Sequence, residues 1–365
     1  MKKKALSLLL SLALVIGLLA ACSQPAAQNS PAPSADPAPE TTAPAEATPS
    51  AQPETRTVTD MAGREVTLPA EINSIATFGS VGVLNAFVEL MGAGDKIANQ
   101  MPPSFTKNDK WKMQYEFAPQ IADGPVLENA DREILIEEVL QLQPDLCLTM
   151  TQSTADYLAE NGQTVIFLSW SEVEDVKVAV ELMGEVLGTQ DIADDYIQYF
   201  DDTVARAAEL TAGLTDEEKV KVLYGSVAGL SQPHRIAEWW ISAAGAVSVT
   251  DDGHTDESYT YTTEDLLGWN PDVILLTSDE REELKADSQI NGVAAIQNDA
   301  MYLVPTVAHV WGNRTVEQPL TILWTVNKCY PDLYSEEELA EDIHYFYEHF
   351  FLYDMSDEQI AEIIG

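Results

Sequence analysis

The sequence predicts an α/β protein made of two similar lobes, each a parallel sheet covered by helices, with one long helix joining them. A phrase near the middle, "IEEVLQLQPDLCL" (136–148), returns as "TEDLLGWNPDVIL" (263–275) with five identical positions at a constant offset of 127 residues. An offset of that size separates domains rather than small repeats. Both halves also alternate short apolar strands with amphipathic helices, which predicts parallel sheets covered on both faces.

The first 21 residues have the composition of a secretion signal. Three lysines precede an apolar run from Ala5 to Ala21, which is short for a membrane span and ends in small residues. The stretch "LAAC" (19–22) resembles the bacterial lipobox, in which the signal is cut before the cysteine and the thiol carries lipid. We therefore expect an extracytoplasmic protein that is lipid-anchored to the cell membrane through Cys22. The alternative is a plain signal peptide with an incidental cysteine.

Residues 22–57 are expected to form a disordered tether rich in Pro and Ala. They contain eight prolines and scarcely any large apolar side chain, so they cannot bury enough surface to offset the entropy of ordering. Such a segment reaches roughly 30 to 100 Å. The folded part is expected to begin at residue 58.

Charge and cysteine content narrow the possible partners. The chain carries a formal net charge of −41, which disfavours nucleic acid and anionic lipid as partners. Cys147 falls in an apolar strand and Cys329 in a helix far along the chain, so free thiols are favoured over a disulfide. The absence of a CxxC pair disfavours a cysteine-based metal or redox site.

The first lobe is expected over residues 58–189. Its segment 72–99 gives an apolar strand, a Gly79-Ser80 turn, an amphipathic helix and a stop at Gly92 and Gly94. Two further strands follow in "PDLCLTM" and "TVIFLSW". Helical periodicity then covers "EVEDVKVAVELMGEVLG" (172–188).

A bridging helix is expected over residues 190–213. Its apolar positions form one long stripe, and neither Gly nor Pro interrupts it before Gly213. About twenty helical residues span roughly 30 Å, enough to connect two lobes. The stripe consists of Ile192, Tyr196, Tyr199, Phe200, Val204, Ala207 and Leu210.

The second lobe, over residues 214–365, repeats the order of the first. Segment 220–249 places Gly225-Ser226 where the first lobe has its turn and Gly245 at the stop, and the later strands are "PDVILLT" and "AMYLVPT". Within that segment Trp239 and Trp240 belong to an apolar helix face and are expected in the core. Helices around 336–350 and 357–364 close the chain, and His344 and His349 in the first of these are interpreted as structural.

The residues resemble a known family at this point. The lipobox and tether, "VTDMAGREVTLPAEINSIATFGS" (58–80), "GAGDKIA", "PDLCLT", "NPDVILLT" and the final "YEHFFLYDMSDEQIAEIIG" look like substrate-binding lipoproteins of ABC importers for iron complexes (siderophore, haem) and cobalamin. The similarity covers about 58–365. It implies two Rossmann-like lobes bridged by one long helix, with the ligand cleft between them, a monomer, no enzymatic activity and no cofactor. The ligand would be a metal chelate, haem or corrinoid.

The same resemblance gives the repeated phrase a role. In such proteins one exposed glutamate on each lobe docks into arginine pockets of the membrane permease, and Glu137 and Glu264 occupy the matching positions. Exposed carboxylates can form bidentate pairs with Arg, and two separated contacts fix an orientation. Alternatively, each glutamate is only an acidic residue that favours a helix start.

Ligand residues are expected in the loops beyond the carboxyl ends of the strands. The favoured loop is "HVWGNR" (309–314), where Trp can stack on a planar ligand while Arg and His face carboxylate or catecholate oxygens. The alternative places Trp311 in the core and pairs Arg314 with Glu317 at the rim. His234 is a weaker candidate. The complete predicted set is Phe78, Ser80, Gln100, Gln152, Trp170, Ser226, His309, Trp311 and Arg314.

A bare metal site is disfavoured, because residues 58–233 contain no histidine and only one cysteine. A rival hypothesis within transport is a binding protein for an oxyanion such as molybdate or tungstate, held by backbone N–H groups of the Gly79-Ser80 and Gly225-Ser226 turns at helix N-termini. An enzyme acting on a chelate is a remote alternative. No GxSxG, GxxxxGK[ST] or HExxH motif supports it.

Overall fold

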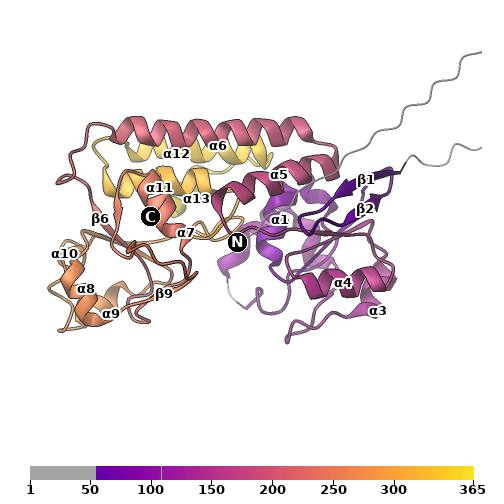
Figure 1. Ribbon diagram of the computed structural model, residues 1–365, viewed down its shortest axis with the longest axis horizontal. Helices are drawn as coiled ribbons and strands as arrows, with labels where there is room; N and C mark the ends of the chain where they lie inside the picture. Colours follow the sequence, from indigo (N-terminus) through magenta and orange to yellow (C-terminus); the bar gives the residue numbers. More distant parts are fainter. Residues whose placement is uncertain (1–54, 108) are drawn as a thin grey trace, which may run out of the picture. The chain divides into compact units, whose positions relative to one another are not determined.

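The computed structural model describes residues 55–107 and 109–365 (Figure 1). The predicted signal, the lipidated Cys22 and nearly all of the tether lie outside the described residues. Strand β1 (Arg56–Thr59) begins two residues before the predicted start of the folded part. Within the described ranges, no helix is both long and apolar enough to cross a membrane.

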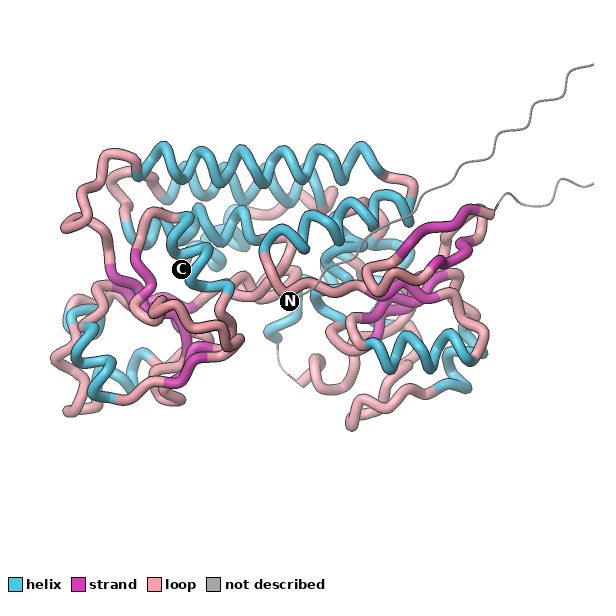
Figure 2. The backbone as a smooth tube through the Cα atoms, viewed as in Figure 1, coloured by secondary structure: helices cyan, strands magenta, loops and turns pink. Residues whose placement is uncertain are grey.

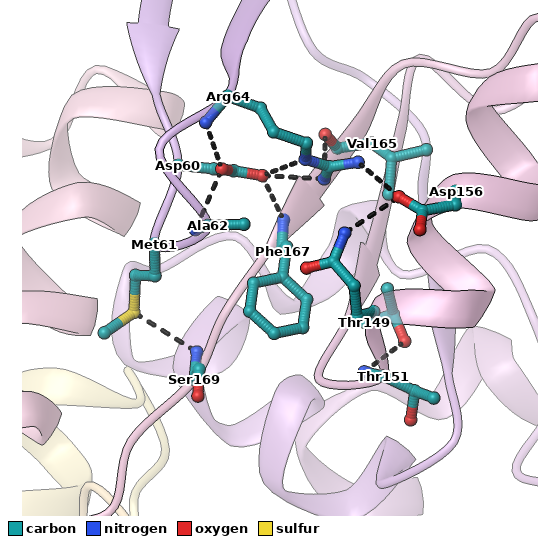
Figure 3. Close-up of polar contacts among 11 residues, drawn as sticks. Asp60, Met61, Ala62, Arg64, Thr149, Thr151, Asp156, Val165, Phe167 and Ser169 are labelled. Atoms are coloured by element: carbon teal, nitrogen blue, oxygen red, sulfur yellow. Dashed lines mark hydrogen bonds and ion pairs between the residues drawn. The ribbon is translucent and has the colours of Figure 1, made fainter.

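The stretch "VTDMAGREV" folds into an antiparallel hairpin of β1 with β2 (Glu65–Leu68). The buried Asp60 carboxylate sits at its turn and accepts hydrogen bonds from Arg64 Nε at 2.9 Å and from the backbone N–H of Phe167 at 3.1 Å (Figure 3). Gly63 adopts a φ of 77°, which a side chain disfavours. Asp60 thus fastens the hairpin to a strand of the first sheet.

The first lobe contains a parallel sheet in the order β3-β4-β5. Its strands are β3 (Ile75–Phe78), β4 (Leu146–Thr149) and β5 (Val165–Phe167), and every residue of β3 and β4 is buried. Burial on both faces is the reason these strands read as continuous apolar runs. The helical segments of this lobe are α1 (Val81–Leu90), η1 (Gly94–Lys96), η2 (Asp109–Trp111), α2 (Lys112–Phe117), η3 (Pro119–Asp123), α3 (Ile136–Leu142) and α4 (Gln152–Glu160).

The second lobe contains a parallel sheet in the order β11-β10-β6-β8. Its strands are β6 (Lys221–Gly225), β8 (Val247–Ser248), β10 (Val273–Leu276) and β11 (Met301–Leu303). A short antiparallel ribbon, β7 (Ser231–Gln232) with β9 (Tyr259–Thr260), lies beside it. The helices are α7 (Ile236–Ala243), α8 (Thr263–Trp269), α9 (Arg281–Ala286) and α10 (Ala294–Gln297).

Helix α5 (Val173–Leu187) is followed directly by α6 (Gln190–Thr211), whose 22 residues extend roughly 33 Å. In Figure 2, α6 runs along one edge of the folded part, above both lobes. It packs against α11 (Gln318–Cys329) and α12 (Glu336–Phe350), and α13 (Asp357–Ile364) ends the chain. The buried Tyr196 donates its hydroxyl to the carbonyl of Val316 at 2.8 Å. The predicted fold class is confirmed.

The repeated phrase has the same local structure in both lobes. Helices α3 and α8 each end in a left-handed residue, Gln143 (φ 54°) and Asn270 (φ 45°), and a Pro-Asp pair follows. The Asp145 carboxylate accepts the N–H of Asn73 at 2.8 Å, and Asp272 accepts the N–H of Lys221 at 2.9 Å. In each lobe, this aspartate holds the entrance of the neighbouring parallel strand.

The second lobe departs from the predicted order after β6. Gly225-Ser226 does not open a helix, because Ser226 pairs with Ser231 and α7 begins only at Ile236. A Cβ on Gly225 would lie 2.1 Å from the carbonyl oxygen of Ser231, so the tight approach of the ribbon requires glycine here.

The two cysteines of the folded part are free, as predicted. Cys147 is buried in β4, and burial raises the pKa of its thiol to about 12. At neutral pH it remains a protonated thiol packed in the sheet.

Candidate functional site

A cavity of about 280 Å³ lies where the two lobes meet. Glu172, which precedes α5 in the first lobe, forms one wall, and residues from α7 and two loops of the second lobe form the rest. Its volume is near the lower end for small-molecule pockets. The second-lobe lining consists of Arg235, Ile236, Glu238, Trp239, Ser242, Asp251 and Arg314.

Two arginine–carboxylate pairs organise this cavity. Arg235 Nη2 lies 2.8 Å from Glu172 Oε1, so this pair connects the lobes. Arg314 forms a bidentate pair with Glu257, at 2.6 Å and 2.9 Å. Burial alone would raise the pKa of Glu257, but hydrogen bonds from Arg314 and His234 outweigh burial and lower it. Glu257 is therefore ionised and partly neutralises Arg314.

Both guanidinium groups retain an unused donor. The Nε atoms of Arg235 and Arg314 are buried and have no hydrogen-bond partner. The Arg314 side chain is 10% exposed and that of Arg235 is 32% exposed. Arginine presents its donors in a planar fork that matches carboxylates and related oxyanions. Both side chains also line the cavity, so a ligand in the cleft that carries anionic oxygens would meet two guanidinium groups.

An aromatic stack closes a second contact between the lobes. The ring of Trp111, the last residue of η2, stacks on His309 with centroids 5.3 Å apart, and the ring centroid of Phe105 lies 5.1 Å from that of Trp111. The rings of Trp111 and His309 cover the start of α1, where a Cβ on Gly82 would lie 2.9 Å from Trp111 and 3.3 Å from His309. Burial lowers the pKa of His309 to about 3, and the charge of Lys110 adds to this effect. His309 is therefore a neutral imidazole at physiological pH.

Buried carboxylates connect this stack to the core. Glu317 is fully buried. Its carboxylate accepts hydrogen bonds from the backbone N–H of His309 at 2.7 Å and from the indole N–H of Trp311 at 3.1 Å. Gln114, on α2, donates to Glu89 Oε2 at 3.2 Å and to the carbonyl of Ala308 at 2.8 Å. Burial raises the pKa of the Glu89 and Glu317 carboxyl groups, and the proximity of Glu317 raises the pKa of Glu89 further. The loop that carries His309 is therefore held by hydrogen bonds from both sides.

The structure corrects the prediction for Trp311. Its side chain has 0% exposure, because its indole N–H is bound to the buried Glu317, so it offers no surface to a ligand. The alternative is half right: Trp311 is in the core, but Arg314 pairs with Glu257 instead of Glu317. Phe78 is likewise fully buried, packed under the sheet of the first lobe, and cannot contact a ligand.

Four other predicted residues of the first lobe lie outside the cavity lining. The side-chain amide of Gln100 donates to the carbonyl of Ala122, and that of Gln152 donates to Asp156, one turn along α4. Trp170 is nearly buried and its ring packs on a phenylalanine at 4.8 Å. Ser80 is exposed just before α1 and makes no capping hydrogen bond.

The turns invoked for oxyanion binding are already filled by carboxylates of the chain itself. Glu128, which is buried, accepts the N–H of Gly79 at 2.8 Å. In the second lobe, Glu280 accepts the Ser226 hydroxyl at 2.6 Å and the N–H groups of the next two residues at 3.0 and 2.9 Å. The oxyanion hypothesis in its predicted form is thus wrong for Ser226, because that turn neither starts a helix nor has free donors.

The residues that were predicted as core, structural or weaker candidates have different outcomes. Trp240 is fully buried as predicted, but Trp239 is only half-buried and lines the cavity. His234 Nδ1 lies 3.0 Å from Glu257, the carboxylate that also pairs with Arg314. His344 and His349 lie in α12, where they pair with Asp354 and Asp195.

Sequence reasoning missed Phe105, Trp111, Glu172 and Glu257. The first two belong to "FTKNDKWK", a run of aromatic and basic residues that could have indicated a ligand loop. Glu172 and Glu257 are isolated acids in an acidic chain, and no sequence pattern distinguishes them.

Glu137 and Glu264 occupy equivalent places in the two lobes. Each is the second residue of its helix, α3 or α8, and each is exposed. In Figure 1 these two helices lie along the same lower edge of the folded part.

Two lobes of parallel sheet, a long connecting helix and a cleft between them define an extracytoplasmic solute-binding fold. The chain belongs to the periplasmic binding protein family, whose model matches residues 85–308. Members of this family are solute-binding proteins of ABC transporters and not enzymes. Across the described part of the chain, no group of three or more His, Cys, Asp or Glu side chains could hold a metal ion.

Individual proteins support the assignment. The chain is 26% identical over 175 residues to the iron(3+)-hydroxamate-binding protein YxeB of Bacillus subtilis, a match that covers 48% of this chain and only about half (49%) of that relative. A periplasmic solute binding protein from Veillonella parvula aligns with a TM-score of 0.74 and 24% identity, over 85% of this chain and 97% of that one. The molybdate-bound MolA of Haemophilus influenzae aligns with a TM-score of 0.69 and 20% identity, over 82% and 99%.

Proposed function

We propose that this protein captures an iron complex, a siderophore or haem, or else cobalamin, and delivers it to the permease of an ABC importer. The observation that carries the proposal is the pair of cleft arginines, each with a buried and unpartnered Nε. Such donors suit a ligand with carboxylate, catecholate or propionate oxygens. Within the proposed range, the arginine pair therefore favours anionic iron complexes over neutral ones.

Two further observations support an iron complex of an organic chelator as the ligand. The side chain of Trp239 gives the cleft a planar apolar surface beside its charges, as an organic chelate requires. The relative YxeB is an iron(3+)-hydroxamate-binding protein. A cavity of about 280 Å³ is small for such a ligand, so we infer that the Arg235–Glu172 pair opens to admit it.

A small oxyanion is the second candidate, because MolA binds molybdate and the arginine pair would also attract it. The filled turns at Gly79 and Ser226 weaken this candidate, since an oxyanion could use their backbone donors only by displacing Glu128 or Glu280 and would otherwise depend on the arginine pair alone.

The remaining parts of the proposal concern delivery. Cys22 would carry lipid and anchor the protein to the cell membrane, while Glu137 and Glu264 would dock on arginine pockets of the permease. Exposed carboxylates at equivalent places on two lobes offer two separated contacts, which is what a fixed orientation on a partner requires.

The test is a thermal-shift screen of the purified full chain against ferric hydroxamate, catecholate and carboxylate siderophores, haem, cobalamin and molybdate. A bound ligand at a hundredfold excess over its dissociation constant stabilises the native state by about 2.7 kcal/mol. We expect a selective shift with an iron complex. A shift with molybdate alone would replace this proposal by the second candidate, and no shift with any iron complex or cobalamin would refute it.

A further inference from the structure

A second cavity, of about 600 Å³, lies between α12 and α13 and shares no residue with the ligand cleft. Its lining positions on α12 follow helical spacing and therefore form one continuous face. The positions on α13 do the same. The α12–α13 groove is lined by Glu337, Ala340, Glu341, His344, Tyr345 and Glu348 from α12, and by Asp357, Ile360, Ala361 and Ile364 from α13.

The floor of the groove is apolar. It consists of the small side chains of Ala340 and Ala361 and the buried side chains of Ile360 and Ile364. Tyr345 stands at one side with 47% of its surface exposed, which is high for an aromatic residue. An exposed apolar depression with a polar rim is typical of a site for another molecule.

The rim is acidic. Neither α12 nor α13 contains Lys or Arg. Within the described ranges, Glu337, Glu341 and Asp357 have no cationic partner within 4 Å, and Glu348 has only His344, at 3.6 Å. The long-range field of a chain with a net charge of −41 has the same sign. A cationic partner would therefore be attracted at long range and would then pair with the rim.

The geometry favours a helix as the occupant. Both walls are α-helices, whose backbone groups are bonded internally, so no sheet edge is open to an added strand. The lined face of α12 from Glu337 to Glu348 is roughly 16 Å long, the length of a three-turn helix. A third helix with apolar residues at i, i+3, i+4 and i+7 can lay that stripe on the floor.

We propose that the α12–α13 groove docks a basic amphipathic helix of a partner protein. In Figure 1, α12 runs beside α6 at the edge opposite α3 and α8. An occupant of the groove would therefore leave Glu137 and Glu264 uncovered.

The experiment measures fluorescence anisotropy of a labelled fourteen-residue peptide of Leu and Lys, arranged with helical spacing, against the full chain. The first variant is the triple change Glu337→Gln, Glu341→Gln and Glu348→Gln. The second is Ala361→Trp, which fills the floor without changing charge. The matched control is Glu181→Gln, Glu185→Gln and Glu209→Gln, which removes three exposed charges from α5 and α6.

We expect the rim triple variant and Ala361→Trp each to weaken binding about tenfold, while the control triple changes it less than about twofold. Thermal unfolding checks that each variant is folded, and the rim variant decides the result if Ala361→Trp is not. Equal weakening by the two triple variants would show diffuse charge attraction and overturn the proposal. Unchanged affinity of a folded Ala361→Trp protein, or no saturable binding, would overturn it as well.

Discussion

Arg314→Gln should weaken binding of the anionic iron complex more than any other single change in the cleft. The Arg314 side chain is 10% exposed, so its hydrogen bonds to ligand oxygens form away from water. A charge-assisted hydrogen bond of this kind contributes about 1.5 to 3 kcal/mol. At 1.4 kcal/mol per factor of ten, the dissociation constant should rise by roughly 10- to 150-fold.

The same argument predicts a smaller effect at Arg235. Its side chain is 32% exposed and its partner Glu172 is 63% exposed, so solvent screens its charge. An exposed pair of this kind contributes at most about 1 kcal/mol, and Arg235→Gln should weaken binding by about fivefold. The order of the two effects therefore follows from burial alone.

Isothermal titration calorimetry of each variant with the iron complex that gives the largest thermal shift would measure both effects. Arg281→Gln is the matched control, because Arg281 pairs with Asp279 on the same lobe and lies outside the cavity lining. Its affinity should equal that of the unaltered protein. Full affinity in a folded Arg314→Gln protein, or a larger loss at Arg235, would refute the arginine site.

Three further predictions concern docking, the hairpin and the buried acids. The double change Glu137→Ala and Glu264→Ala should abolish uptake into cells while ligand affinity stays unchanged. Glu138→Ala should leave both uptake and affinity unchanged. A loss of affinity in the double variant would exclude the docking role. Asp60→Ala should lower the free energy of unfolding in urea by about 3 kcal/mol, because it removes the buried carboxylate that binds Arg64 and leaves the N–H of Phe167 without its acceptor; a loss below about 1 kcal/mol would contradict the fastening role. Burial raises the pKa of Glu89 well above its usual 4.5, so the free energy of unfolding should fall as pH rises from 4.5 through the raised pKa. Glu89→Gln should flatten that fall, and an unchanged slope would contradict the assignment to Glu89.

The fold could be predicted because its determinants are local. Strand and helix periods, the turn at Gly79 and the repeated Pro-Asp phrase each act over a few residues, and the structure confirms the lobes they indicated. The prediction of a helix directly after Ser226 failed because the chain forms a ribbon there, in which Ser231 pairs with the distant Thr260. Ser231, five residues away, pairs with Ser226, and the chain forms a ribbon before it can enter a helix.

The site could be predicted only in part, because its residues come from separate segments. From the loop "HVWGNR", Arg314 lines the cavity, whereas the side chain of Trp311 points into the core, and the sequence contains no signal for that direction. That direction is set by Glu317, whose carboxylate binds the indole and also accepts the hydroxyl of Tyr347, thirty residues further on. Glu172 lies far along the chain from the arginine it pairs with, and no short pattern records such a contact.

The carboxylates of Glu128 and Glu280, which fill the turns at Gly79 and Ser226, affect how the protein responds to other anions. Open backbone N–H groups at these turns would attract small anions from the medium. Glu128 and Glu280 are tethered to the same chain, so their effective concentration at these donors exceeds that of any dissolved ion. The protein thus supplies its own anions at the turns, so that under the proposed function an anionic ligand would depend on the arginines of the cavity.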